Sequence, residues 1–181
     1  MKWSAYESPF GLLTLIGGEA GLREVHFPGR APALDHLERD DQPFRDVLSQ
    51  LEEYFAGERE AFDVALDLSG TEFQWRVWRA LQELPFGSVT TYGALAGELG
   101  VRDSVTAAAG GRTVTAPQKV GSAIGATPTP IAIPCHRVVG ADGSLTGYRG
   151  GLHRKRALLD FEARRVGRAG FWTHQGQLSL L

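Results

Sequence analysis

Three prolines stand within seven residues in the stretch PTPIAIPCHRVVG, at positions 128, 130 and 134. Proline fixes its own φ angle, lacks a backbone N–H group and pushes the preceding residue toward extended geometry. This stretch is therefore expected to be stiff and extended. It leads directly to Cys135, whose thiol it would hold in a pre-set position.

Cys135 is the only cysteine of the 181 residues, and His136 follows it directly. A thiol reacts as the thiolate, which a neighbouring histidine can generate and a carboxylate can support by orienting that histidine. Adjacent side chains of an extended chain point to opposite sides, so the pair needs a local turn or a relaying water. The carboxylates nearest in sequence are Asp142, Asp160 and Glu162. The pair alone does not separate a protease, an acyltransferase or an alkyltransferase from a buried cysteine beside a surface histidine.

The composition limits the class of protein. Hydrophobic residues make up 43% and charged residues 22%, which indicates a globular chain with one good core or two small ones. No run of 18 apolar residues and no signal-peptide pattern is present, so we expect no membrane partner. One cysteine can form neither an internal disulfide nor a multi-cysteine zinc site, and the histidines lack ligand spacing. We therefore expect a cytoplasmic protein that needs no metal and no cofactor.

The charge is divided unevenly along the chain. The formal net charge is −2, but residues 1–70 sum to −8 and residues 71–181 to +6. The second half can therefore meet a polyanion, although ordinary solvated surface charge is an equal alternative.

The first half of the chain shows the pattern of a small α+β domain. Short β-rich runs at 4–8, 12–18 and 22–27 are separated by turn residues. Apolar residues at helical spacing predict a helix within 42–58, ended by Gly57. Alternation over 61–68 predicts a further strand.

The second half reads as mostly helical. Two T-x-x-Q capping boxes, at 71–74 and 115–118, predict helix starts. A helix is also expected from about Thr90 or Thr91 to Gly100, and a last one over 152–165. Two helices in a basic segment suggest a helix-turn-helix, although 101–114 is longer than its usual turn.

PCHRVVG, followed by GSLTGYRGG and LLDFE, resembles the active-site signature of the O6-alkylguanine-DNA alkyltransferases, or methylated-DNA–protein-cysteine methyltransferases. YESPFGLLTL, GLREVHF and GTEFQWRVWRALQELPFGSVTTYGALA are similar to other parts of that family, so the resemblance covers nearly the whole chain. It implies an α+β protein with an RNase-H-like domain over 1–70. A winged helix-turn-helix domain would follow over 71–181, with an atypical insertion at about 101–114.

The resemblance also implies an activity. A guanine alkylated at O6 would be flipped out of double-stranded DNA, and Cys135 would take its alkyl group in one irreversible displacement per molecule. His136 would deprotonate Cys135 through a water, Glu162 would orient His136, and Tyr92 would rotate the target phosphate and protonate guanine N3. The protein would act as a monomer without cofactor.

Further residues are implied to meet DNA or the base. Tyr148 and Arg149 lie in a loop over the bound base, the Val138 carbonyl reads the guanine amino group, and small residues allow a close minor-groove approach. The full set is Arg112, Gln118, Gly121, Ser122, Thr127, Arg137, Val138, Tyr148 and Arg149.

Three departures from the family pattern qualify this set. Gln118 stands where the family carries an arginine that fills the gap left by the flipped base, and Thr127 stands where an asparagine is usual. The third is the insertion, from which Arg102 or Arg112 is a candidate replacement for that arginine. A protein of the same fold that binds alkylated DNA without chemistry is the main alternative, but such relatives lack the cysteine. A cysteine hydrolase or acyltransferase is a third reading.

Overall fold

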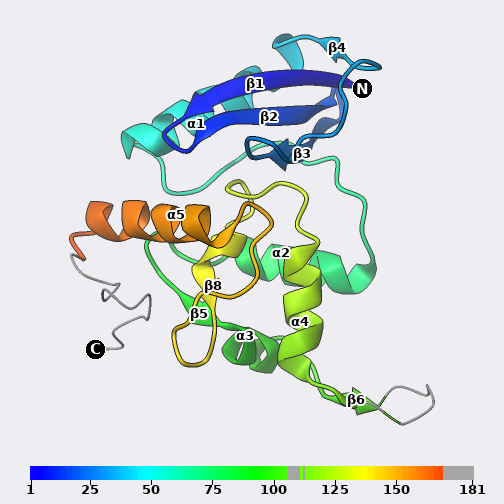
Figure 1. The fold of residues 1–181 in the computed structure, drawn as a ribbon, viewed down its shortest axis with the longest axis vertical. Coiled ribbons are helices and arrows are strands. Elements are labelled where there is room, and N and C mark those ends of the chain that lie inside the picture. Colours follow the sequence, from blue (N-terminus) through cyan, green and yellow to red (C-terminus); the bar gives the residue numbers. More distant parts are fainter. Residues whose placement is uncertain (106–110, 112, 169–181) are drawn as a thin grey trace. The chain divides into compact units, whose positions relative to one another are not determined.

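The computed structural model describes residues 1–105, 111 and 113–168, and its chain divides into two compact units (Figure 1). The first comprises 1–69 together with 128–133, and the second comprises the rest. The proline-rich stretch was expected in the second domain but belongs mostly to the first. The reason is local pairing, because Val25 N donates a hydrogen bond to the Pro128 carbonyl, at 2.9 Å.

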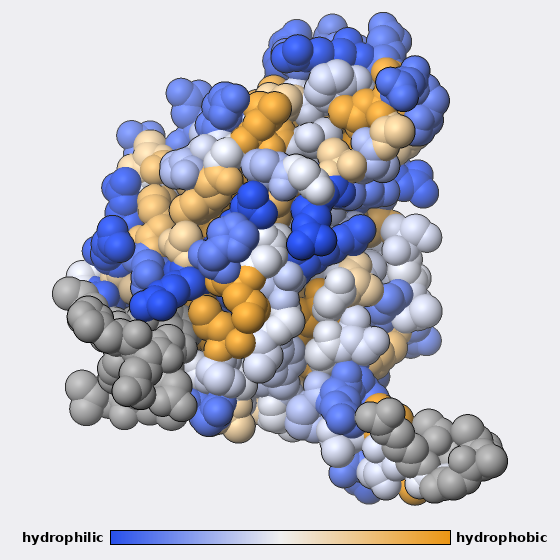
Figure 2. Space-filling view, in the orientation of Figure 1, coloured by the Kyte–Doolittle hydropathy of each residue, from blue (hydrophilic) through white to orange (hydrophobic). Residues whose placement is uncertain are grey.

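The N-terminal unit is built on one four-stranded sheet of order β3-β2-β1-β4. Its strands are β1 (Lys2–Ser8), β2 (Gly11–Gly18), β3 (Gly21–His26) and β4 (Glu38–Arg39). The first three form an antiparallel meander, as their β-rich runs predicted, while β4 pairs parallel to β1. Much of the face of this unit drawn in Figure 2 carries hydrophilic side chains, in keeping with its many charges.

Helix α1 (Arg45–Ala56) follows a 3₁₀ turn, η1 (Gln42–Phe44), and confirms the predicted helix. Gly57 ends it in the left-handed conformation, with φ of 81°, which a glycine adopts without strain. Phe55 of α1 stacks on Tyr6 of β1, with ring centroids 5.9 Å apart. The helix and the sheet thus share the core of this unit, in which Leu13, Leu15 and Tyr54 are fully buried.

The strand predicted over 61–68 is wrong. Only an isolated bridge between Leu22 and Leu66 forms there. The side chain of Gln50, on α1, occupies both backbone groups of Asp63: Nε2 donates to its carbonyl at 2.7 Å, and Oε1 accepts from its N–H at 2.8 Å. Those groups are therefore not available to a strand ladder.

The loop before Cys135 is a tight turn rather than a simple extended segment. Ile133 N donates to the Thr129 carbonyl at 2.9 Å, and Pro130 and Ile133 form a bridge. Ile131 between them has a φ of 79°, a strained value for a β-branched residue. The stiffness expected from the prolines therefore takes the form of a closed loop.

The second unit contains four α-helices in its described residues: α2 (Glu72–Gln82), α3 (Tyr92–Glu98), α4 (Ala116–Gly125) and α5 (Leu152–Arg165). Both capping boxes form as predicted, at Thr71 with Gln74 and at Thr115 with Gln118. Trp78 of α2 is buried and its Nε1 donates to the Ala123 carbonyl of α4 at 3.0 Å, so it is a core aromatic. The fold thus agrees with the expected α+β class.

The insertion before α4 begins and ends as a small hairpin. Strand β6 (Ser104–Val105) pairs antiparallel with β7 (Thr113–Val114), which the sequence did not predict. Asp103 Oδ1 accepts a hydrogen bond from Ala116 N at 2.6 Å, which joins the hairpin to the first turn of α4. Arg112, a predicted DNA contact, lies outside the described residues.

Gln50 provides a test of this packing. Gln50→Leu keeps the approximate size of the side chain but leaves the N–H and C=O groups of Asp63 without their partners. We expect the free energy of unfolding to fall by about 0.5–1.5 kcal/mol, the range for a net hydrogen-bond contribution, because Asp63 is exposed and water replaces part of the lost bonds. Urea denaturation measures this, with Gln82→Leu at an exposed position as the matched control. Equal stability of the two variants would contradict the assignment.

Candidate active site

Cys135 opens a short 3₁₀ turn, η2 (Cys135–Arg137), and its side chain is buried. The turn supplies the local bend that an extended Cys–His pair lacks. Strand β8 (Val138–Val139) follows at once and pairs parallel with β5 (Thr90–Thr91). Because the pairing is parallel, the cysteine turn precedes β8 beside the start of β5, and Tyr92 follows β5 at the opposite end of this two-residue pair.

His136 and Glu162 form a buried pair. Nε2 of His136 donates to Oε1 of Glu162 at 2.9 Å, and both side chains are 0% exposed. Of the three carboxylates near Cys135 in sequence, Glu162 is thus the one that reaches the histidine.

Arg137 and Gly87 complete the surroundings of Glu162. The guanidinium of Arg137 donates from Nε to Oε2 at 2.9 Å and from Nη2 to Oε1 at 2.7 Å, and Gly87 N donates to Oε2 at 3.0 Å. Burial raises the pKa of Glu162, but the charges and hydrogen bonds of His136 and Arg137 outweigh burial and hold this pKa low. Glu162 is therefore an ionised carboxylate, as its donors require.

The carboxylate determines the state of the imidazole. An ionised acceptor requires a proton on Nε2, which leaves the lone pair on Nδ1. Nδ1 of His136 has no hydrogen-bond partner among the described residues. Burial lowers the pKa of His136 and outweighs the opposite effect of Glu162, so the ring is neutral and able to accept a proton.

The thiol of Cys135 rests in its protonated form. Burial raises its pKa to about 11, while the charge of Lys155 and the Thr127 hydroxyl lower it in part. The Thr127 Oγ1 atom is itself buried and forms no hydrogen bond of standard geometry within the described part of the chain. A base is therefore needed to generate the thiolate at neutral pH.

Lys155 is a site residue that the sequence reading missed. It is fully buried, and its Nζ donates to the Thr146 carbonyl at 2.9 Å and to the Tyr92 hydroxyl at 3.5 Å. Burial lowers its pKa to about 8, against the opposite effect of Cys135. The sequence does hold a signal, because Lys155, Leu158 and Glu162 lie on one helical face, at i, i+3 and i+7.

Tyr92 lies beside Lys155 and beside α4. Its hydroxyl donates to the Thr146 carbonyl at 3.2 Å, and the Lys155 ammonium lies 5.7 Å from its ring centroid. A methyl group at Gly121 would meet the Tyr92 ring at 3.5 Å, so α4 approaches the ring closely. Burial raises the pKa of the phenol, which therefore stays protonated.

Arg137 corrects one expectation. It was predicted to contact DNA, but it is buried, and besides Glu162 it donates from Nη1 to the Leu84 carbonyl at 2.6 Å. A guanidinium held by a buried carboxylate is not available to phosphate. The guanidinium of Arg137 instead keeps the carboxylate of Glu162 ionised.

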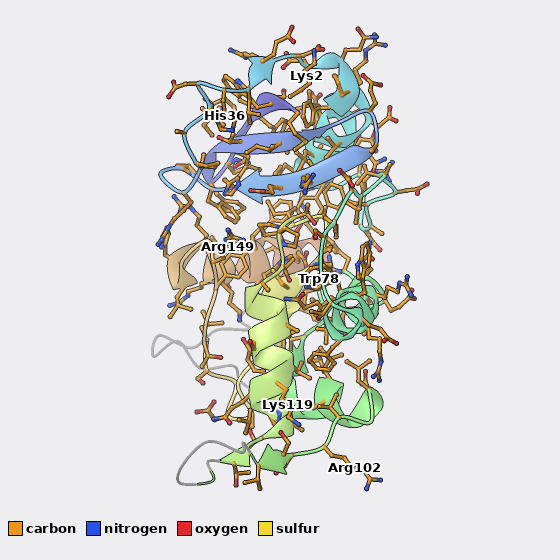
Figure 3. All side chains as sticks on the ribbon, turned by 90° about the vertical axis from the view of Figure 1, so that its right-hand side faces the viewer. Lys2, His36, Trp78, Arg102, Lys119 and Arg149 are labelled. Carbon is orange, nitrogen blue, oxygen red and sulfur yellow. The ribbon has the colours of Figure 1, made fainter. Side chains whose placement is uncertain are left out.

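The other predicted residues are spread over α4 and the loops around η2. Thr127 and Val138 are buried near Cys135 in the chain, Tyr148 is half-buried, and Arg149 is exposed (Figure 3). Gln118 and Ser122 are exposed on α4, and Gln118 Oε1 accepts from Thr115 N at 2.9 Å. Gln118 therefore acts as a helix-capping residue in this structure.

No group of three or more histidine, cysteine, aspartate or glutamate side chains suited to a metal ion occurs in the described residues. None of the helices described there is long and apolar enough to span a membrane.

A buried cysteine, a neutral histidine and an oriented carboxylate define a protein that uses cysteine as a nucleophile. Comparison with known proteins then narrows this class. Residues 1–68 match the family model described as 6-O-methylguanine DNA methyltransferase, ribonuclease-like domain, and residues 72–164 match the DNA binding domain of the same name. The chain belongs to this family, which confirms the resemblance seen in the sequence.

Individual relatives agree with the family models. Proteins named methylated-DNA–protein-cysteine methyltransferase are 43% identical in Mycobacterium bovis and 41% in Methanosarcina acetivorans, over 92% and 90% of this chain and 94% and 98% of theirs. The crystal structure of Mycobacterium tuberculosis OGT in complex with DNA matches with a TM-score of 0.77 at 42% identity, covering 91% of this chain and 94% of that one. The O6-methylguanine-DNA methyltransferase of Pyrococcus kodakaraensis matches with a TM-score of 0.55 at 25% identity, covering 89% and 98%.

The raised pKa of Cys135 predicts the pH dependence of its reactivity. A thiol with a pKa of about 11 is only slightly ionised below pH 10, so alkylation by iodoacetamide is expected to rise continuously from pH 7 to pH 10 without a plateau. Lys155→Met removes the cation that lowers this pKa, so a smaller fraction of thiolate and a slower reaction are expected near pH 7, and the difference should shrink above pH 8, where Lys155 of the wild-type protein loses its charge. The control is Lys2→Met in the N-terminal unit. A plateau below pH 8 in the wild-type protein would contradict the prediction.

Proposed function

We propose that this protein repairs DNA by transferring the alkyl group from O6 of guanine in a duplex to the sulfur of its own Cys135, once per molecule. The observation that carries this proposal is the buried Cys135 turn beside the His136–Glu162 pair, in a chain whose two domains match the methyltransferase family. A monomer acting in the cytoplasm is part of the proposal.

The first step is deprotonation of the thiol. The Cys135 proton passes through a water to Nδ1 of His136, since Nε2 is engaged with Glu162. The imidazolium that results is stabilised by the ionised carboxylate at 2.9 Å. The thiol thus remains protonated until a substrate is bound, and the general base accepts its proton during the transfer.

The second step is an in-line displacement. The sulfur forms a bond to the alkyl carbon while the bond between that carbon and O6 breaks, and the electron pair of the broken bond passes to the guanine. Tyr92 donates its phenolic proton to guanine N3, which neutralises the leaving base. Lys155, with Nζ 3.5 Å from the Tyr92 hydroxyl, is placed to return a proton to the phenolate. The products are a thioether at Cys135 and an unmodified guanine.

A thioether carries no leaving group that the site can expel, so the reaction stops after one turnover. A cysteine hydrolase differs at this point, because its thioester intermediate reacts with water. The number of product molecules formed per protein molecule therefore distinguishes alkyl transfer, which stops at one, from hydrolysis, which continues.

The test is the mass of the intact protein after incubation with a duplex that contains one O6-methylguanine. A gain of one methyl group, lost in Cys135→Ser, is expected. Tight binding of this duplex without a mass gain would favour the non-catalytic alkylated-DNA-binding protein. Repeated turnover of an ester or peptide would favour a hydrolase.

Glu162→Gln tests the proton path. The neutral amide neither enforces a proton on Nε2 nor stabilises the imidazolium, so the single-turnover rate of methyl transfer is expected to fall at least about tenfold. It also leaves the buried Arg137 without its counter-charge, which is expected to cost about 3–5 kcal/mol in the free energy of unfolding.

Asp160→Asn is the matched control on the same helix, since Asp160 forms an ion pair of 3.8 Å with Arg156 on a partly exposed face. Its transfer rate and stability are expected to stay near those of the wild-type protein. A Glu162→Gln variant as fast as this control would remove Glu162 from the mechanism.

A further inference from the structure

Helix α4 offers little positive charge to DNA. Its exposed residues include Gln118, Ser122 and Gly125, none of which is charged, and the side chain of Gln118 closes the capping box. Proteins that bind DNA without regard to sequence gain most of their affinity by neutralising phosphates with lysine and arginine. Lys119 is the one cation of this helix, so further cations have to come from neighbouring segments.

A groove beside α4 supplies them. It has a volume of about 520 Å³ and is lined by apolar side chains of Phe73, Val101 and Val114 and by cationic side chains of Arg76, Arg102 and Lys119. No carboxylate lies among its lining residues in the described part of the chain. The groove therefore has the charge that suits an anion, together with apolar surface that suits a sugar.

Contacts with the inserted segment and with the end of α3 hold this arrangement in place. Lys119 Nζ donates to the Arg102 carbonyl at 2.6 Å, and Arg76 Nη2 donates to the Leu99 carbonyl at 2.7 Å. Asp103 anchors the base of the β6–β7 hairpin to Ala116 of α4. Figure 3 shows Lys119 near the N-terminal end of α4 and Arg102 on the segment that leads into the hairpin.

We propose that this groove binds the sugar–phosphate backbone of a DNA strand that lies along α4, with Arg76, Arg102 and Lys119 as phosphate contacts. The inference rests on the proposed function, which brings duplex DNA to α4. The insertion thereby extends the DNA-binding surface of a helix that lacks an arginine of its own. Phosphate contacts carry no sequence information, which suits a protein that must act on damage in any sequence.

This assignment differs from a role for Arg102 in filling the gap of a flipped base. A phosphate contact acts on every duplex, damaged or not, and contributes to the salt dependence of binding. A gap-filling side chain acts only after the base has left the helix, so it affects the transfer step on damaged DNA.

Arg102→Ala is the cleanest variant, because its side chain forms no hydrogen bond or ion pair within the described residues, whereas its backbone carbonyl, which holds Lys119, is retained. Binding to an undamaged duplex is measured by fluorescence anisotropy over a range of salt concentrations. We expect affinity to fall about threefold to tenfold at low salt. The slope of log K against log salt should become shallower by about 0.9 for each phosphate that the variant no longer neutralises.

In the double variant Arg76→Ala/Arg102→Ala, the slope of log K against log salt should become shallower by about twice that amount. Arg45→Ala, an exposed arginine at the start of α1, is the matched control and is expected to keep the wild-type slope. Thermal unfolding of each variant checks that the fold is retained.

Two results would overturn the inference. One is an unchanged affinity and slope in the double variant. The other is an unchanged slope with slower methyl transfer at saturating damaged DNA in Arg102→Ala, which would assign Arg102 to the base gap. Failure of the proposed function appears separately, as the absence of any methyl gain in the wild-type protein, because the salt slope is measured on undamaged DNA.

Discussion

The carboxylate of Glu162 is the interaction on which the active site depends. It lies on α5, and its oxygens accept hydrogen bonds from His136 and Arg137 in the cysteine turn and from Gly87 in the turn before β5. One buried group therefore connects three segments that are far apart in the sequence. An ion pair in this position is costly to desolvate, but its directional hydrogen bonds join those segments to one another.

The same buried environment has two opposite effects on the ionisation of Cys135. Burial keeps Cys135 protonated, with a pKa of about 11, while the nearby Lys155 ammonium favours the thiolate. Burial also lowers the pKa of Lys155 to about 8, so its charge persists at neutral pH but is easily lost above it. The thiol is thus held protonated by desolvation, while the charge of Lys155 partly offsets that effect.

Around α4, charge and shape are supplied by different parts of the chain. The helix itself has small residues, such as Gly121, which allow close contact with the Tyr92 ring. Apart from Lys119, the cations stand on α2 and on the insertion, where Arg76 and Arg102 line the groove beside the helix. A helix that approaches DNA closely gains from short side chains, and flanking cations can neutralise phosphates without occupying that surface.

Much of the local structure could be read from the order of residues. The capping boxes at Thr71 and Thr115, the left-handed Gly57 and the helical spacing of apolar residues predicted the helix boundaries, because each signal acts within about one turn of chain. The Cys135–His136 pair was likewise visible, and with the family pattern it indicated the chemistry.

Other features were decided by contacts between distant residues. Arg137 turns inward and Lys155 is buried because Glu162 and the Thr146 carbonyl provide partners that lie elsewhere in the sequence. Residues 61–68 alternate like a strand, yet Gln50 takes the hydrogen bonds of Asp63 that a strand would use. A local pattern indicates which face of a segment is apolar. Buried polar groups need hydrogen-bond partners, and the tertiary fold determines which residues provide them.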